Sequence, residues 1–369
     1  MGHGLGPLVV AHVGEVVVIA LGERGHRGLE RGVAEKVVCL EGHGDRLAAR
    51  SDRRRRVPLA SPGMRFAVMI EGQEDVTWDD WVAIAEACER LGFEALFRSD
   101  HYLSVEGASD RGALDAWGTI CGLAAVTTTV RLGTLVSPAT FRHPSVLAKL
   151  VVTADHISGG RVELGLGAGW NVEEHEAYGF ELPPMGARVD RLAEQLEIVH
   201  GIWRGEPFSF AGAHWSVREL AARPKPVQTP HPPLVMGGAA KPRAAALAAR
   251  FADEYNVVHT SPADAAAARG RLREACERAG RDPDTLPLSL MHAFLVGADG
   301  DDLRERRERM AEWGHADTSG WLTGTPDEIV AALRAYEEAG VTRVMLQHLL
   351  HRDTAALELL AAEVLPAFA

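Results

Sequence analysis

The sequence predicts an α/β protein built on a (β/α)8 TIM barrel. Short Val-, Ile- and Leu-rich segments alternate with amphipathic helical segments from Met64 to the end of the chain. Eight such pairs suit this barrel, which usually needs ~250 residues plus insertions. An open doubly wound sheet is the alternative, but its dinucleotide-binding G-x-G-x-x-G turn is missing after the first expected strand, where the sequence continues as Glu71-Gly72-Gln73-Glu74.

Each expected strand is followed by its own helix. We predict strands over residues 65–70, 95–99, 130–136, 161–167, 233–236, 254–258, 286–296 and 341–347. The helices are expected near residues 77–91, 113–127, 144–158, 188–203, 243–251, 264–279, 326–339 and 354–365. In the first helix, Trp78, Trp81 and Ala85 share one apolar stripe, and Gly92 supplies the stop. In the seventh, Thr325 caps the helix with Glu328 placed to close a capping box.

Two segments exceed the plain repeat and are predicted to be insertions after strands 4 and 7. Residues 208–217 alternate around Gly212, which is typical of a β-hairpin. Residues 298–323 are polar and charged, with a helical pattern over residues 303–313. We expect the second insertion to be able to act as a lid.

Residues 1–63 differ from the rest and end near the run Arg53-Arg54-Arg55-Arg56. Met64 begins the first expected strand directly after Ser61-Pro62-Gly63. We therefore expect residues 1–63 to be a disordered leader or a wrongly assigned start, and residues 64–369 to be the barrel domain. A nucleic-acid patch or a targeting address are the alternatives for the arginine run.

Composition excludes several classes of function. The formal net charge is −12, and because residues 1–63 contribute +3, the remainder carries −15, which argues against general binding to nucleic acid or anionic membranes. No run approaches the ~18 apolar residues of a membrane span. The cysteines Cys39, Cys88, Cys121 and Cys276 form no metal-binding or disulfide pattern, so we expect a cytoplasmic protein without structural zinc.

Candidate functional residues follow the expected strands, because the active site of such a barrel lies at the C-terminal strand ends. Asp100 and His101 after strand 2 form an ionisable pair suited to proton transfer, although a helix cap and a surface histidine are the alternative. The small and hydroxylated residues after strand 3 suit a planar ligand, although an ordinary loop is equally compatible with their composition. Glycines occupy alternate positions at Gly165, Gly167 and Gly169, so one face of the strand has no side chains there. This suggests close approach of a ligand.

The ends of strands 5 and 6 suit an anion. Gly237 and Gly238 precede a helix, where backbone amides can bind phosphate, and Thr260 and Ser261 add hydroxyls; a tight turn is the alternative for the glycine pair. We predict no metal site, because consecutive residues such as Glu174 and His175 cannot face one ion. A further set of histidines is expected to serve packing or surface roles: His292, His348 and His351.

In combination these strand ends resemble the luciferase-like monooxygenase superfamily, specifically its branch that uses coenzyme F420, a deazaflavin. The resemblance is carried by Ser99-Asp100-His101-Tyr102, Arg131-Leu132-Gly133-Thr134, Gly167-Ala168-Gly169-Trp170-Asn171 and Gly324-Thr325-Pro326. It implies an oxidoreductase that transfers a hydride between F420 and an unidentified small organic substrate, and a homodimer. An FMN-dependent monooxygenase using O2 is the alternative, and a non-catalytic binding barrel is a third.

The resemblance also implies roles for individual residues. His101 corresponds to the hydride-transfer region, and Glu174 and His175 are the nearest candidates for a proton donor. The implied cofactor contacts are Asp100, Thr134, Leu135, Ser137, Gly169, Trp170, Asn171, Gly237, Gly238, Thr260 and Ser261. Thr134-Leu135 corresponds to a bulge that commonly contains a non-prolyl cis peptide. The sequence departs from the sugar-phosphate dehydrogenases of this branch, which carry a glutamate where Trp170 stands and a tryptophan where Val105 stands.

Overall fold

The computed structural model describes residues 9–13, 16–20, 63–108, 110–205 and 207–369. The chain divides into two units, residues 1–55 and 56–369. In the first unit, β1 (Val9–Val13) pairs antiparallel with β2 (Val16–Ala20). The predicted leader, including its arginine run, lies mostly outside the described residues.

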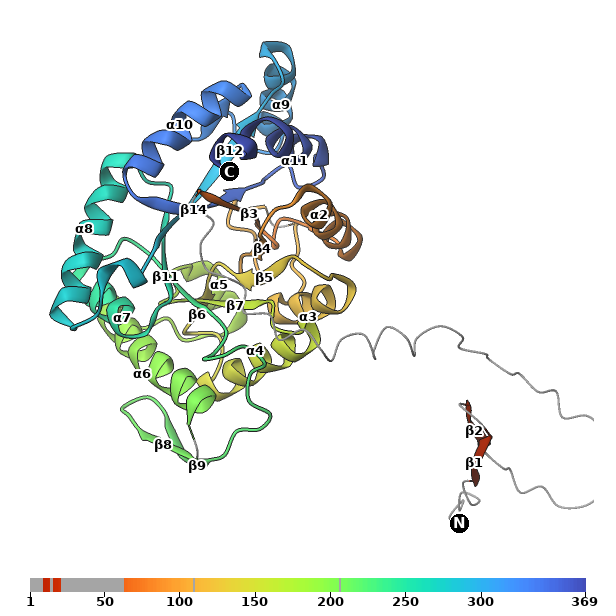
Figure 1. The fold of residues 1–369 in the computed structure, drawn as a ribbon, viewed down its shortest axis with the longest axis vertical. Coiled ribbons are helices and arrows are strands. Elements are labelled where there is room, and N and C mark those ends of the chain that lie inside the picture. Colours follow the sequence, from red (N-terminus) through yellow and green to blue (C-terminus); the bar gives the residue numbers. More distant parts are fainter. Residues whose placement is uncertain (1–8, 14–15, 21–62, 109, 206) are drawn as a thin grey trace, which may run out of the picture. The chain divides into compact units, whose positions relative to one another are not determined.

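Within the described part of the second unit, eight parallel strands close into a barrel, as predicted (Figure 1). They are β3 (Arg65–Ile70), β4 (Ala95–Arg98), β5 (Arg131–Thr134), β7 (Val162–Gly167), β10 (Leu234–Gly237), β11 (Glu254–Val258), β12 (Leu288–Val296) and β14 (Val341–Gln347). The pairing of β7 with β10, Leu164 opposite Leu234, closes the ring. Because all eight strands run in one direction, their C-terminal ends share one rim.

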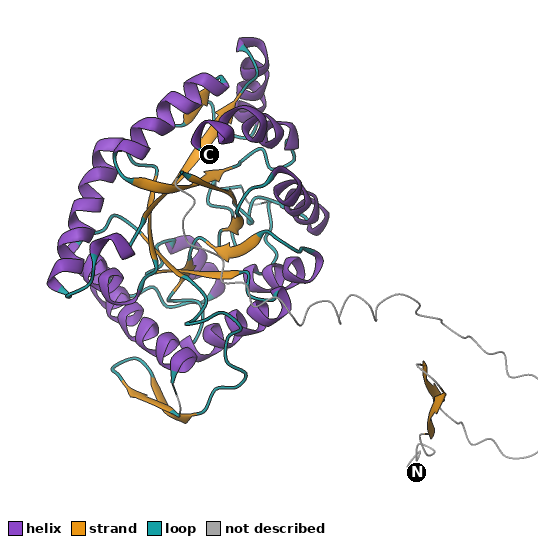
Figure 2. Cartoon of the chain, viewed as in Figure 1, coloured by secondary structure: helices purple, strands orange, loops and turns teal. Residues whose placement is uncertain are grey.

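Helices cover the outside of this barrel, as Figure 2 shows. They are α2 (Trp78–Leu91), α3 (Ala116–Val126), α4 (Pro144–Ser158), α6 (Met185–Arg204), α7 (Pro242–Phe251), α8 (Pro262–Arg278), α10 (Pro326–Glu338) and α11 (Thr354–Leu359). The single helix predicted over residues 354–365 is wrong in detail. Beyond α11 the chain continues as a π-helical turn, Leu360–Val364, and a 3-10 turn, Leu365–Phe368.

Local sequence signals explain where these helices begin and end. The Thr77 hydroxyl accepts from the Asp80 N–H (3.2 Å) and the Asp80 carboxylate accepts from the Thr77 N–H (3.0 Å), which forms a capping box at α2. Gly92 ends α2 in the left-handed region, at φ 80°. The predicted capping box of Thr325 and Glu328 is confirmed at α10.

Both expected insertions contain the predicted elements. The hairpin consists of β8 (Phe208–Ala211) and β9 (Ser216–Leu220), and the Glu194 carboxylate on α6 accepts from backbone N–H groups at its tip. The charged insertion contains α9 (Gly300–Glu312), followed by the short strand β13 (Leu322–Gly324), which pairs with β12. Two short elements were not predicted: β6 (Ser137–Pro138) and α5 (Val172–Tyr178).

The barrel interior changes character along its axis. Its middle is apolar, with Met69, Phe97 and Met345 fully buried. Near the N-terminal strand ends, the buried Arg343 donates to both oxygens of Glu163 (2.8 and 3.2 Å). The opposite rim carries the polar residues described below. Among the described helices, none is both long and apolar enough to cross a membrane.

Candidate active site

The ends of β4, β5 and β7 converge on one polar group of side chains. The Leu135 N–H donates to the Arg98 carbonyl (2.8 Å), which joins the end of β5 to that of β4. The Ser137 hydroxyl donates to Asp100 Oδ2 at 2.5 Å. The Trp170 ring, after β7, meets the His101 ring edge-on with centroids 5.5 Å apart. Residues predicted separately from three strand ends are therefore neighbours.

His101 and Glu174 form a hydrogen-bonded dyad. His101 Nδ1 lies 2.8 Å from Glu174 Oε2, and the Glu174 carboxylate is fully buried. Glu174 also accepts from the backbone N–H groups of Tyr102 and Leu103. Burial of the imidazole opposes its charged form, but the hydrogen bond and charge of Glu174 prevail and raise the pKa of His101 above its ordinary value. The dyad therefore favours a protonated His101 whose ring is only partly exposed.

The helix that carries Glu174 forms for local reasons. Asn171 caps the N-terminus of α5, where its side chain accepts from the Glu174 N–H (3.4 Å), and Gly179 ends the helix at φ 70°. These two signals, which flank the seven residues of α5, are present in the sequence and would have predicted the helix. Tyr102 stacks on Tyr178 with ring centroids 5.0 Å apart, which holds α5 against the loop after β4.

Asp100 is buried and already partnered. Besides Ser137, it binds Arg142, whose Nη1 lies 2.5 Å from Oδ2 and whose Nη2 lies 3.1 Å from Oδ1. The same guanidinium reaches the Tyr102 hydroxyl and the Asp115 carboxylate, both at 2.9 Å. Arg142 could not be recognised as the partner of Asp100 from the sequence, because it lies 42 residues further along the chain. The buried Asp100, held by Ser137 and Arg142, therefore forms the bottom of the site.

The predicted bulge after β5 is present. Thr134 and Ser137 are buried with their hydroxyls 3.1 Å apart, and Leu135 is 8% exposed at the top of the apolar interior. A non-prolyl cis peptide joins Leu135 to Val136, one bond beyond the position expected.

The prediction that a ligand closely approaches the glycines of the fourth barrel strand is wrong for Gly165 and Gly167. A Cβ at Gly165 would lie 1.9 Å from the Thr134 carbonyl oxygen, and a Cβ at Gly167 would lie 2.7 Å from Val136. The bare strand face is therefore filled by the chain's own bulge and not by a ligand. Gly169 serves a similar need, since its Cβ would lie 2.8 Å from Thr140 Oγ1.

His175 is not brought together with His101. Both of its ring nitrogens have partners: Nδ1 lies 2.5 Å from the Asn171 carbonyl oxygen, and Nε2 lies 2.7 Å from Thr140 Oγ1. The ring is buried against Phe141, with centroids 5.1 Å apart. These contacts fasten α5 to the barrel. Trp170 is 60% exposed, and Val172 and Tyr178 nearby are exposed as well, whereas Asn171 is half-buried.

The ends of β10 and β11 border a cleft of about 400 Å³. Gly238, at φ 140°, and Thr260 line it, together with Arg271 of α8. Arg271 donates to the carbonyl oxygens of Ala239 and Ala240 (3.1 and 3.0 Å), so its cationic group is held beside the glycine turn. Gly237 precedes this turn, whereas Ser261 caps α8 by bonding Asp264. Arg271 was not predicted, because it lies in the middle of α8 and not at a strand end.

A third part of the rim was also missed. Glu71, after β3, accepts from Gln347 Nε2 of β14 (2.5 Å) and from Gln73 Nε2 (2.8 Å). His259 follows β11 on the same rim, where its backbone N–H donates to the Met291 carbonyl (3.0 Å). Glu71 forms no ion pair with any residue that the structure describes. The polar rim therefore extends from β4 across β3 and β14 to β11.

The three histidines that were predicted to serve packing or surface roles are buried: His292, His348 and His351. His348 is buried, its Nε2 lies 3.0 Å from the Asp353 carbonyl oxygen, and its ring stacks on Phe294. Burial lowers its pKa to about 4.

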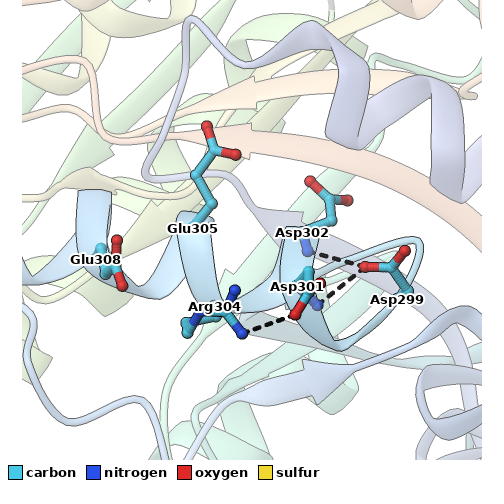
Figure 3. Close-up of a pocket in the computed structure, with 6 residues that line it drawn as sticks. All are labelled: Asp299, Asp301, Asp302, Arg304, Glu305 and Glu308. Atoms are coloured by element: carbon cyan, nitrogen blue, oxygen red, sulfur yellow. Dashed lines mark hydrogen bonds and ion pairs between the residues drawn. The ribbon is translucent and has the colours of Figure 1, made fainter.

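A second hollow, of about 490 Å³, lies along α9 (Figure 3). Its walls are side chains of the N-terminal half of α9 and its cap: Asp299, Asp301, Asp302, Arg304, Glu305 and Glu308. Asp299 accepts from the Asp301 and Asp302 N–H groups at 2.9 Å, which is ordinary helix capping. Across the described residues there is no cluster of three or more His, Cys, Asp or Glu side chains suited to a metal ion.

A parallel (β/α)8 barrel with an imidazole–carboxylate dyad and a glycine-bordered cleft at its C-terminal rim has the architecture of a cofactor-binding enzyme. The luciferase-like monooxygenase family model matches residues 64–320. The chain belongs to this family, whose members are oxidoreductases and monooxygenases.

Named relatives span two kinds of cofactor chemistry. The chain is 29% identical over 246 residues to the F420-dependent hydroxymycolic acid dehydrogenase of Mycobacterium tuberculosis, covering 66% of either chain. It is 26% identical over 258 residues to the FMNH2-dependent dimethylsulfone monooxygenase of Pseudomonas putida, covering 69% of this chain and 68% of that one. An F420-dependent secondary alcohol dehydrogenase structure shares the fold, with TM-score 0.71 and 20% identity over 83% of this chain and 99% of that one.

Proposed function

We propose that this protein is an F420-dependent oxidoreductase that transfers a hydride between the deazaflavin and a small organic substrate. The observation that carries the proposal is the His101–Glu174 dyad beside the exposed Trp170. A reaction that moves a hydride also needs a group that gives or takes a proton, and the dyad provides one at the rim. The F420-dependent relatives support the choice of cofactor.

The residues present fit a flat, anionic-tailed cofactor. Gly238 lines the cleft at φ 140°, a conformation in which a side chain would be strained, so the backbone there stays accessible. Arg271 supplies positive charge beside it for a phosphate. Leu135 and Trp170 would form an apolar wall for the ring, and Asp100, Thr134 and Ser137 form the floor beneath it. Further cofactor contacts are proposed at Gly169, Asn171, Gly237, Thr260 and Ser261, of which Thr260 lines the cleft.

When bound, the deazaflavin would serve as the two-electron hydride carrier, whereas the protein would orient the reactants and exchange the proton. His101 exchanges the proton at its ring nitrogen Nε2, because Nδ1 is engaged by Glu174. Glu174 keeps that tautomer and orientation fixed. Leu135 and Trp170 exclude water from the reacting carbon. His175 holds α5, and thereby Glu174, in place.

Equilibrium titration tests the choice of cofactor. Purified protein is titrated with oxidised F420 and, separately, with FMN, while cofactor fluorescence and oxygen uptake with each reduced cofactor are followed. We expect binding of F420 and no uptake of oxygen linked to it. Binding of FMN alone, with oxygen consumed by its reduced form, would instead support the monooxygenase. The homodimer and the cytoplasmic location stay predictions.

A further inference from the structure

Arg142 contacts the side chains on both sides of His101. It lies between β6 and α4, and its side chain is only 10% exposed. Its guanidinium donates to both oxygens of Asp100, at 2.5 and 3.1 Å, and to the Tyr102 hydroxyl at 2.9 Å. Asp100 and Tyr102 directly precede and follow His101 in the chain. One guanidinium therefore holds both neighbours of the proposed proton-transfer residue.

This arrangement depends on the forked shape of the guanidinium. Nη1 donates to Asp100 Oδ2, whereas Nη2 faces Asp100 Oδ1, the Tyr102 hydroxyl and Asp115 Oδ2, the last at 2.9 Å. The Tyr102 hydroxyl donates in turn to Asp115 Oδ2 (3.0 Å), which closes the set of contacts around Arg142. A lysine ammonium is a compact point charge without this fixed fork. It could pair with Asp100 but would not hold Tyr102 at the same time.

Arg142 is itself fixed to the barrel. Its partner Asp115 caps α3, and the carbonyl of the preceding Leu114 accepts from Arg98 Nη2 (2.9 Å). Arg98 is buried at the end of β4. The Gln195 side-chain amide of α6 donates to the Arg142 backbone carbonyl (3.2 Å). Both the backbone and the side chain of Arg142 are therefore held by elements of the barrel.

The His101–Glu174 dyad is sensitive to the position of Tyr102. Glu174 binds His101 Nδ1 (2.8 Å) and also accepts from the backbone N–H groups of Tyr102 and Leu103. Because one carboxylate binds both the imidazole and the backbone that follows it, a shift of Tyr102 would change the alignment of Glu174 with the ring. The geometry of the dyad therefore depends on Arg142 through Tyr102.

We propose that Arg142 is a positioning residue that holds residues 100–102, and with them the His101 ring, in the orientation for proton transfer. This inference rests on the proposed function, in which His101 exchanges a proton at Nε2. A proton moves between two groups only within hydrogen-bond reach, about 2.6–3.2 Å, so a displaced ring loses rate. The guanidinium also keeps the buried Asp100 paired beneath the site. Arg142 itself stays charged and exchanges no proton.

Hydrogen exchange at His101 tests this role without a substrate. The exchange of the His101 Nδ1–H with water is measured by NMR on the full chain, in the wild type, Arg142→Lys and Tyr102→Phe. We expect exchange about 10-fold faster in Arg142→Lys, because the ammonium keeps a charge beside Asp100 but releases Tyr102. Tyr102→Phe removes only the hydroxyl that Arg142 binds and should accelerate exchange as well. An unchanged rate in either variant would overturn the role.

A second arginine provides the matched control. Arg65 is also half-buried and also binds two carboxylates, Glu94 at 2.9 Å and Glu254 at 3.2 Å, but it lies at the N-terminal end of β3. Arg65→Lys should leave the exchange at His101 unchanged. The backbone amides of β4, followed in the same samples, report general loss of stability. If Arg142→Lys accelerates them by the same factor as the His101 Nδ1–H, the effect is general destabilisation and the proposal fails.

Titration with oxidised F420, followed by cofactor fluorescence, separates this inference from the proposed function. A wild type that binds no F420 rejects the proposed function, whereas the exchange rates of the free protein still decide whether Arg142 holds His101. If F420 binds, exchange is measured again at saturation, and we expect Arg142→Lys to remain faster than the wild type. Equal rates in the bound state would mean that the cofactor alone orients His101, which would overturn the role of Arg142 in the reaction.

Discussion

The proton affinity of His101 depends mainly on the buried carboxylate of Glu174. Glu174 contacts Nδ1 of the ring and two backbone N–H groups, so its charge is held in place by the chain itself. We expect Glu174→Gln to lower the pKa of His101, because the amide cannot stabilise the imidazolium as a carboxylate does. NMR titration of His101 measures this shift. The neighbouring exposed residue gives the control, Glu173→Gln, and a His101 pKa that is the same in both variants would contradict the account.

A second buried histidine makes the fold sensitive to acid. The His200 ring lies 4.7 Å from the His231 ring, and its Nε2 has no hydrogen-bond partner among the residues that the structure describes. Burial lowers the pKa of His200 to about 3. The unfolded chain therefore binds more protons than the fold between about pH 6.5 and 3, and stability is lost as pH falls through that window. The loss has a slope of up to about 1.4 kcal/mol per pH unit.

Replacing His200 should reduce the loss of stability at acid pH. We expect the unfolding free energy of His200→Gln to depend less on pH between 6.5 and 4 than that of the wild type. Urea unfolding at a series of pH values measures it. His214→Gln, on the exposed hairpin, should leave the slope unchanged. A slope shared by all three proteins would show that His200 is not responsible.

At the scale of single residues, the sequence predicted individual residues of the site but not the residues that they contact. His101 and Asp100 could be predicted from their place after a strand, because strand ends form the site in this architecture. Arg142, Glu71 and Arg271 could not, since their roles depend on which distant segments the barrel brings together. The same limit explains the error over Gly165 and Gly167. A glycine face signals close approach, but sequence does not say whether a ligand or the chain approaches.

Among the elements, the strands are joined at their N-terminal ends by buried charge. Arg343 of β14 binds Glu163 of β7 bidentately, lies 3.4 Å from Glu254 of β11 and 3.1 Å from Glu94. The guanidinium lowers the pKa of Glu163 to about 2 against the cost of its burial. Stability from Glu163 is therefore present above its unfolded pKa, near 4.5, and is lost as pH falls below that value.

Removing this cation should destabilise the barrel strongly. We expect Arg343→Met to lower the unfolding free energy by about 3–5 kcal/mol. Glu163 keeps Arg131 (2.6 Å) and Glu254 keeps Arg65 (3.2 Å), but the buried cluster loses one cation and is left with an unbalanced negative charge. Arg352→Met removes an exposed pair with Asp80 and should cost less than about 1 kcal/mol. Denaturant unfolding compares the two. A loss no larger for Arg343→Met than for Arg352→Met would contradict this view of the cluster.

Element boundaries were predictable where caps mark them. Strands β11 and β14 and helix α4 coincide with the predicted ranges. The short helix α5 was missed because its polar residues mask any helical stripe, although Asn171 and Gly179 mark its ends. The π-helical turn after α11 has no comparable signal, since its register depends on packing against the barrel.

For the whole molecule, the strand–helix alternation predicted the barrel, because eight parallel strands with crossover helices have few other closed arrangements. The family match begins at residue 64, where the first barrel strand follows one residue later. We expect a truncated chain starting at Met64 to unfold at the same temperature as the full chain and to bind the cofactor equally. Calorimetry and cofactor titration of both chains compare them. A truncated chain that unfolds several degrees lower would show that residues 1–63 stabilise the barrel.

The proposed activity requires a flat deazaflavin to lie at the rim formed by the ends of β4, β5 and β7. A crystal structure of the protein with oxidised F420 measures this most directly. We expect the ring against Leu135 and Trp170, its reactive face toward His101, and its phosphate between Gly238 and Arg271. A ring bound elsewhere, or a rim closed by side chains in crystals grown with saturating F420, would contradict the central claim.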